Sequence, residues 1–221
     1  MTALCQLASD WLGTIPTGGL MCERKWDGWR CLRFRGIDGK ARLWSRNGMP
    51  LEGASAIARR LDAIEEAAGC RLFLDGEVVV DSTLAATKAY FEGGWRRGEE
   101  RGVLHLFDVM PEAEWRAGGT DMPLHERKTW LEHLVKASEP EDDGWSWAAG
   151  SKGATTPTVV RVVPDEWAFT ESDVLDIVNR VWAIGGEGLM LKAAEAPYRR
   201  NRNPSWWKVK QDNAYKWRHA A

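Results

Sequence analysis

The sequence has few of the residues that build metal sites and disulfide frameworks, with four cysteines and four histidines among 221 residues. Cys5, Cys22, Cys31 and Cys70 show no C-x-x-C spacing and no histidine at the interval of a zinc site, so neither a zinc knuckle nor a disulfide framework is indicated. We expect the cysteines to be reduced and partly buried.

Long apolar runs are also missing. No run approaches the roughly 20 residues that cross a bilayer, and the first twenty positions lack the basic-then-apolar order of a secretory signal. No internal repeat or low-complexity tract is present. We therefore expect an intracellular, cytoplasmic protein that is not secreted, has no membrane partner and is a monomer. With 44% hydrophobic residues, the chain is long enough for a packed core.

The net charge is -2, but the charged residues are unevenly distributed along the chain. The segment 199–221 carries seven cations against one anion, with four aromatic residues interleaved. This composition suits a phosphate-backbone partner, and a solvated basic tail explains it equally well. The cations are Arg199, Arg200, Arg202, Lys208, Lys210, Lys216 and Arg218.

Hydrophobic periodicity predicts an α+β fold with mainly antiparallel sheets, because strands cluster without regular β-α-β alternation. A hairpin is expected over 21–44 around a turn at 36–39. Further strands are expected at 71–80, interrupted at Asp75-Gly76, and at 103–109, 159–163, 189–192 and 206–210. Helices are expected at 54–68, 84–91, 124–135 and 171–184, with an exposed loop at 139–153.

Six short motifs follow one another along the chain. A K-x-D-G tetrapeptide alone occurs by chance in roughly one chain of this size in twenty, so only the ordered set is informative. The set comprises Lys25-Trp26-Asp27-Gly28 with Arg30, Ser45-Arg46-Asn47-Gly48, Leu74-Asp75-Gly76-Glu77, Phe107-Asp108, Glu187-Gly188-Leu189-Met190-Leu191-Lys192 and Trp207-Lys208-Val209-Lys210.

This set resembles the covalent nucleotidyltransferase superfamily of ATP-dependent DNA ligases, RNA ligases and mRNA capping guanylyltransferases. The resemblance spans about residues 23–210, and the S-R-N-G and L-D-G-E forms are most similar to the DNA ligase branch. It implies a nucleotidyltransferase fold of two mainly antiparallel sheets with flanking helices and the nucleotide between them. We expect residues 1–221 to form that single domain.

A lysine in such a motif can attack the α-phosphate of a nucleotide and hold the nucleotide as a phosphoramidate, which splits one transfer into two easier ones. Lys25 is the candidate nucleophile. A free lysine near pH 7 is neutral in roughly one molecule in a few thousand. We therefore hypothesise that nearby cations, namely Lys192, Lys210 and a metal ion, favour the neutral form of Lys25.

The resemblance also assigns roles to the other nucleotide-binding candidates. Lys192 and Lys210 would reach the α-phosphate, and Phe107 would stack on the purine. Glu23 would lie near the adenine edge, with a surface salt bridge as its simpler explanation. The cofactors implied are ATP and Mg²⁺ or Mn²⁺, with Glu187 at the metal and Glu77 near the ribose or as a second metal ligand.

Arginine forks are suited to phosphate and ribose oxygens. Arg30 and Arg46 are expected to bind the nucleotide, and Arg46 also the 5′-phosphate of a nick. The expected contacts to nucleic acid further include Lys208, Arg199, Arg200 and Arg202. Each residue, taken singly, also fits an ordinary turn, core or strand-surface position.

The leading function is that of an ATP-dependent DNA ligase core acting on nicked duplex DNA. RNA ligation, guanylyl transfer to RNA ends and a non-catalytic nucleic-acid-binding module are the alternatives. Most members of the superfamily append an oligonucleotide-binding (OB) barrel after the last motif, yet 11 residues follow Lys210, too few for five strands. We expect no C-terminal OB-fold domain here and a separate OB-fold or clamp protein as a possible partner.

Overall fold

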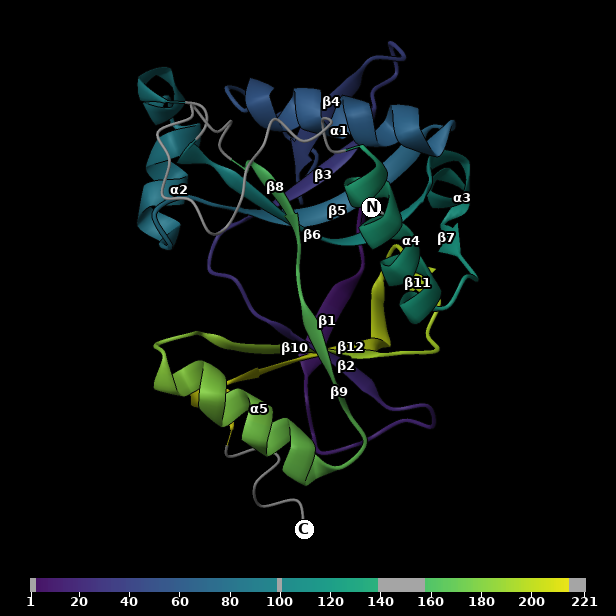
Figure 1. The fold of residues 1–221 in the computed structure, drawn as a ribbon, viewed down its shortest axis with the longest axis vertical. Coiled ribbons are helices and arrows are strands. Elements are labelled where there is room, and N and C mark those ends of the chain that lie inside the picture. Colours follow the sequence, from purple (N-terminus) through teal and green to yellow (C-terminus); the bar gives the residue numbers. More distant parts are fainter. Residues whose placement is uncertain (1–2, 99–100, 139–157, 215–221) are drawn as a thin grey trace, which may run out of the picture.

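The computed structural model describes residues 3–98, 101–138 and 158–214. In this part of the chain the strands form two five-stranded sheets and a two-stranded pair, with helices on the outer sides of the sheets (Figure 1). The α+β class and the two-sheet architecture predicted from the sequence are confirmed.

The first sheet has the strand order β1-β12-β10-β2-β9. Its pairs are antiparallel except for β1 and β12, which run parallel. Helix α5 covers its outer side and buries Val174, Ile177 and Val178 against it. The elements are β1 (Leu7–Asp10), β2 (Leu20–Arg24), β9 (Asp165–Ala168), α5 (Glu171–Ala183), β10 (Gly188–Ala193) and β12 (Arg202–Lys210).

The second sheet has the order β4-β3-β5-β6-β8, with β6 and β8 parallel and the other pairs antiparallel. Helices α1 and α4 pack on it, and Leu61 and Leu131 are fully buried in the shared core. The elements are β3 (Trp29–Arg35), β4 (Ala41–Ser45), α1 (Ser55–Ala68), β5 (Leu72–Val79), β6 (Val103–Pro111), α4 (Leu124–Ala137) and β8 (Val160–Val162).

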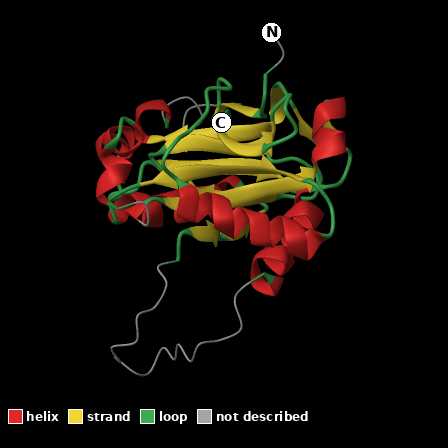
Figure 2. Ribbon diagram, turned by 90° about the horizontal axis from the view of Figure 1, so that it is seen from above, coloured by secondary structure: helices red, strands yellow, loops and turns green. Residues whose placement is uncertain are grey.

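Short elements complete the fold around the second sheet and at the end of β12. Viewed from above, the helices lie along the sides of the stacked strands (Figure 2). These short elements are α2 (Leu84–Phe91), η1 (Gly94–Arg97), α3 (Glu112–Ala117), the paired β7 (Gly119–Thr120) and β11 (Tyr198–Arg199), and η3 (Gln211–Asn213).

A third apolar cluster lies between the two sheets. Leu32 and Phe73 come from the second sheet, and Trp206 comes from the first. Phe107 and Met190 pack at its edge and also line the cavity described below. Burial of this cluster holds the facing sides of the sheets together at one end, because apolar area removed from water is favourable at about 25 cal/mol per Å².

Helix ends follow the local signals in the sequence. Thr170 and Asp173 form the predicted capping box of α5, each side chain accepting from the other residue's backbone N–H. Helix α1 ends at Gly69 with φ of 64°, the left-handed conformation that favours glycine. The predicted helices at 54–68, 84–91, 124–135 and 171–184 are therefore present within one or two residues.

The predicted hairpin over 21–44 is partly wrong. Residues 29–45 do form a hairpin, β3 with β4, around the turn at 36–39. Residues 20–24, however, pair with β9 and β10 of the other sheet. Lys25, expected on the first strand, lies just beyond β2 where the chain leaves that sheet. Alternation alone predicts strand conformation but not which sheet a strand joins.

Other strand predictions hold with changed limits. The predicted interruption at Asp75-Gly76 is a register shift between β5 and β6, not a break in β5. Strand β6 continues to Pro111, two residues beyond the predicted range 103–109. Strands β1 and β9 were not expected, since each has only four residues.

The cysteines are free, with Cys5, Cys22 and Cys31 buried and Cys70 exposed. The predicted loop at 139–153 lies outside the described residues, as do the tail cations Lys216 and Arg218. Within the described part, none of the helices combines the length and apolar character needed to span a bilayer.

A buried ion pair connects β6 to α4. Asp108 accepts from Arg127 Nε at 2.7 Å and Nη2 at 2.9 Å, and both side chains are fully buried. Arg127 Nη1 also donates to the carbonyl of Ala196 at 3.1 Å. The pair therefore fixes α4 against the second sheet and against the segment that follows β10.

Replacing Arg127 with Met is expected to lower the free energy of unfolding by about 3–5 kcal/mol, because Asp108 would remain buried without its partner. Urea unfolding measures the change. The matched control is Arg180→Met, which breaks a highly exposed pair with Glu166 and should cost below about 1 kcal/mol. Equal, small losses in the two variants would contradict the role given to Asp108 and Arg127.

Candidate active site

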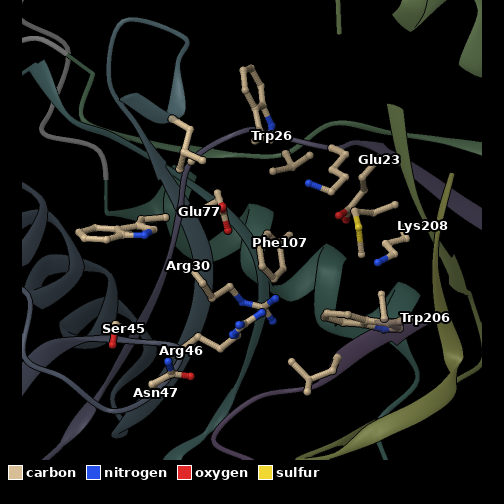
Figure 3. Close-up of a pocket in the computed structure, with 18 of the residues that line it drawn as sticks. Glu23, Trp26, Arg30, Ser45, Arg46, Asn47, Glu77, Phe107, Trp206 and Lys208 are labelled. Atoms are coloured by element: carbon tan, nitrogen blue, oxygen red, sulfur yellow. The ribbon is translucent and has the colours of Figure 1, made fainter. Parts of the chain in front are cut away.

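A cavity of about 1020 Å³ opens between the two sheets. Strands of both sheets line it, together with the turn after β4 and helix α2. Figure 3 shows polar and aromatic side chains that converge on it from opposite sides. The predicted site residues in its lining are Glu23, Lys25, Arg30, Arg46, Glu77, Phe107, Lys192, Arg202 and Lys208.

Lys25 lies on the four-residue crossing, 25–28, by which the chain passes from the first sheet to the second. Its backbone N–H donates to the carbonyl of Gly188 at 2.9 Å. At the other end, a Cβ on Gly28 would lie 2.1 Å from the carbonyl oxygen of Val78, so only glycine fits there. The backbone of the candidate nucleophile is thus held to both sheets.

Glu187, just before β10, joins the two outer lysines. Lys25 Nζ lies 2.5 Å from Glu187 Oε2, and Lys210 Nζ lies 3.0 Å from Oε1. The hydrogen bond to Glu187 raises the pKa of Lys210. Lys25 thus contacts an anionic side chain, and Lys210, one of the cations expected near it, shares the same carboxylate.

A second charge cluster is buried beside the cavity, and two of its members, Glu23 and Lys192, line it. Glu23 forms ion pairs with two lysines: Lys128 Nζ lies 2.6 Å from Oε1, and Lys192 Nζ lies 2.6 Å from Oε2. Lys128 also lies 3.7 Å from Asp165, and burial raises the pKa of Asp165. Burial lowers the pKa of Lys192. Glu23 is therefore a buried ion-pair residue and not a surface one.

Aromatic rings surround the Lys192 ammonium. Nζ lies 4.4 Å from the centroid of Phe107 and 4.3 Å from that of Trp206. The two rings meet edge to face at 6.0 Å. A cation over ring faces is stabilised by the ring quadrupole, so Lys192 is held by a carboxylate and two aromatic rings.

Two guanidinium groups converge at the lower part of the cavity, where Figure 3 shows the side chains of Arg30 and Arg46 pointing toward each other. Arg30 is anchored by two hydrogen bonds to the fully buried Asp75, one of them 2.6 Å, and its Cζ lies 4.6 Å from the Phe107 centroid. Tyr198 Oη also donates to Asp75, at 2.6 Å. Arg46 makes no ion pair with any residue in the described ranges. Such an arrangement favours an anionic ligand.

Glu77 projects from β5 beside these arginines and is directly opposite Arg30 in the β3–β5 pairing. Burial raises the pKa of Glu77 from 4.5 to about 7, against the opposing influence of Arg30 and Lys25. Its carboxyl group also accepts from the backbone of Gly28. Glu77 is thus a poorly hydrated carboxyl group at the point where the crossing joins the second sheet.

The predicted nucleic-acid contacts separate into two groups. Lys208 and Arg202 line the cavity. Arg199 and Arg200 do not. Arg199 donates to the carbonyl of Thr120 at 2.8 Å, and Arg200 donates to backbone carbonyls at 3.1 and 3.2 Å. The last two guanidinium groups stabilise the chain around β7 and α3 in this structure.

The donor set for a divalent cation is small. No group of three or more His, Cys, Asp or Glu residues in the described ranges could hold a metal ion. Mg²⁺ commonly binds through one or two carboxylates together with waters and substrate phosphates. Glu187, which contacts both Lys25 and Lys210, could provide one carboxylate of such a site. A cation bound there would compete with the two lysines for the carboxylate oxygens.

Several site residues were missed by sequence reasoning. Lys128 is the fifth residue of α4, and its sequence position does not distinguish it from a solvated helix lysine, because burial beside a carboxylate of another segment leaves no local signal. Tyr198, which supports Arg30 through Asp75, was also missed, and Asp75 was named only as part of the L-D-G-E motif. Trp206 was counted only as an aromatic residue in a basic segment.

The fold is that of the nucleotidyltransferase domain of DNA ligases. ATP-dependent DNA ligase from bacteriophage T7 in complex with ATP aligns with a TM-score of 0.71 at 15% identity, over 93% of this chain and 68% of that chain. Chlorella virus DNA ligase-adenylate aligns at 0.64 and 16%, over 94% and 68%. Pmar-Lig_Pre aligns at 0.74 and 21%, over 95% of this chain, which spans about half, 47%, of that one.

Sequence comparison gives the family directly. The model of the ATP-dependent DNA ligase domain matches residues 2–210, and the chain belongs to that family. No curated protein matches. The resemblance drawn from the six motifs is thereby confirmed at the level of the family and its adenylation domain.

The pKa of Glu77 predicts a pH dependence of stability. Between about pH 4.5 and 7 the unfolded chain loses this proton while the folded chain retains it, so the Glu77 contribution to stability falls as pH rises. Glu77→Gln is therefore expected to gain stability relative to wild type across this window, by at most ~3 kcal/mol. Urea unfolding in metal-free buffer tests this. Glu66→Gln, at an exposed position of α1, is the control; an equal gain there would refute the assignment.

Proposed function

We propose that this domain is the catalytic core of an ATP-dependent DNA ligase that forms a lysyl-AMP intermediate on Lys25. The observation that carries the proposal is the place of Lys25. Its amine lies in a cavity between the sheets, in contact with Glu187, at a crossing whose backbone is fixed at both ends.

In the first step, Nζ of Lys25 attacks the α-phosphorus of ATP, the N–P bond forms, and the bond to pyrophosphate breaks. The amine must lose a proton, and Glu187 Oε2 is the acceptor in contact with it. Lys210 shares that carboxylate, and Lys192 is next to the proposed purine platform, Phe107. Both lysines can stabilise charge on the phosphate during transfer.

In the later steps, AMP passes from Lys25 to the 5′-phosphate of a nick, and the neighbouring 3′-hydroxyl then attacks that phosphate and releases AMP. Arg30 and Arg46 are suited to hold the phosphates, because their guanidinium groups converge in the cavity. Mg²⁺ or Mn²⁺, held by Glu187 and with Glu77 as a second candidate ligand, would neutralise phosphate charge.

Nicked duplex DNA is the proposed partner, with Lys208 and Arg202 at the edge of the cavity as backbone contacts. Arg199 and Arg200 remain candidates that would have to leave their present carbonyl partners. A separate OB-fold or clamp protein could complete the enclosure of the duplex. ATP and DNA as substrates place the proposed reaction inside the cell.

Replacing Lys25 with Ala is expected to abolish the covalent adduct while leaving the fold intact. Intact mass after incubation with ATP or GTP and magnesium measures this: wild type should gain one AMP and the variant nothing. Lys88→Ala, at an exposed position of α2, is the control and should retain the adduct. An adduct on the Lys25→Ala chain would reject the assignment, and a GMP adduct would favour guanylyl transfer.

Replacing Arg46 with Ala is expected to weaken binding to a nick and to reduce the slope of log K against log salt by about 1, as for one lost phosphate contact. Binding of a nicked duplex is measured at several salt concentrations, with exposed Arg59→Ala as control. A duplex with a 5′-hydroxyl at the nick should show no difference between wild type and Arg46→Ala. The same loss on both duplexes would place Arg46 elsewhere on the backbone.

A further inference from the structure

The crossing that carries Lys25 is held by an aromatic stack as well as by its two ends. Trp26 lies on His105 with ring centroids 3.8 Å apart and an interplanar angle of 24°. Arg24 also lies over the indole, with Cζ 4.5 Å from the ring centroid. Face-to-face contacts of this kind add specific attraction to the burial of the rings.

The three members of this stack come from three different parts of the fold. Arg24 is the last residue of β2 in the first sheet, Trp26 belongs to the crossing, and His105 lies on β6 in the second sheet. Trp26 is therefore held where the chain passes from the first sheet to the second. His105 is buried, and its strand is paired on both sides, by β5 and β8, so the ring on which Trp26 rests is itself fixed.

Ring faces, not hydrogen bonds, hold the indole. Trp26 Nε1 is buried and has no hydrogen-bond partner among the described residues, and the same is true of Arg24 Nε. Both residues line the cavity. If the stack acts through ring contact alone, another flat aromatic ring should replace either Trp26 or His105.

We propose that Trp26, stacked on His105, is a positioning residue that fixes the crossing 25–28 and thereby the place of Lys25 Nζ relative to the nucleotide phosphate. The inference rests on the proposed function of Lys25 as the nucleophile. Neither Trp26 nor His105 takes part in bond formation. Their effect passes through the backbone next to Lys25, whose N–H is bonded to Gly188.

The rate of adduct formation at varied ATP concentration tests the inference. A misplacement of about 1 Å can cost ~100-fold in rate, so Trp26→Ala and His105→Ala should lower the rate at saturating ATP by ~10- to 100-fold, with KM for ATP within ~3-fold. Trp26→Phe and His105→Phe keep a ring and should stay within ~3-fold of wild type. The double variant Trp26→Ala/His105→Ala should lose no more than either single variant.

Trp44→Ala is the matched control. Trp44 stacks on Phe34 with centroids 5.0 Å apart, and it does not line the cavity. Its loss removes a comparable ring pair and should leave the rate of the folded protein unchanged. If Trp44→Ala lost as much rate as Trp26→Ala, the rate loss would reflect a general loss of stability, and the inference would be overturned. A raised KM with an unchanged maximal rate in Trp26→Ala would make Trp26 a nucleotide contact and would also overturn it.

Hydrogen exchange separates this inference from the proposed function. The amides of Lys25 and Gly28 are bonded to Gly188 and to Glu77, so their exchange reports the order of the crossing without any nucleotide. Exchange there should accelerate in Trp26→Ala and His105→Ala and remain as in wild type in His105→Phe and Trp44→Ala. If wild type forms no adduct, the proposed function fails while exchange still decides the positioning role. Unchanged exchange in Trp26→Ala would refute that role.

Discussion

The buried carboxylate of Glu23 is the contact on which the arrangement of the cavity depends. It forms an ion pair with Lys192, which lies in the same sheet, and another with Lys128, which lies on a helix packed on the other sheet. Each N–O distance is 2.6 Å. Removing Glu23 would leave two buried ammonium groups without their carboxylate, and uncompensated buried charge is strongly destabilising. The same contact fixes Lys192 beside Phe107 and Trp206 and joins α4 to the first sheet, so the depth of the cavity and the place of its inner lysine are set together.

A division of charge follows from this. The side chains of the inner cluster, Glu23, Lys128 and Lys192, are almost fully buried. The side chains of Lys25, Lys210 and their shared Glu187 are between 22% and 31% exposed. The inner group suits recognition of a fixed ligand, because its members cannot rearrange without breaking buried pairs. The outer group can exchange partners with water, phosphate or a cation, which the proposed role of Lys25 as a nucleophile requires.

Much of this could be predicted from the sequence, for identifiable reasons. Helices α1 and α5 carry apolar residues at helical spacing and clear end signals, and the motifs around Lys25, Glu77 and Lys192 identify the family. The pairing of β2 with β9 and β10 could not be predicted, because the alternation of apolar and polar residues is the same whichever sheet a strand joins. Lys128, Tyr198 and the contact of Asp75 with Arg30 were missed, since ion pairs and hydrogen bonds between distant segments have no periodic pattern. The roles of the individual site residues remain predictions.

The described strands pass between the two sheets at only two places, residues 25–28 and the two-residue link Val163-Pro164 between β8 and β9 (Figure 1). Both border the cavity, and proline restricts the second. Two short links define a line, and a change in the angle between the sheets would turn about that line. Lys25 lies on it. A change in the angle between the sheets would therefore displace the rim of the cavity further than it displaces the amine of Lys25.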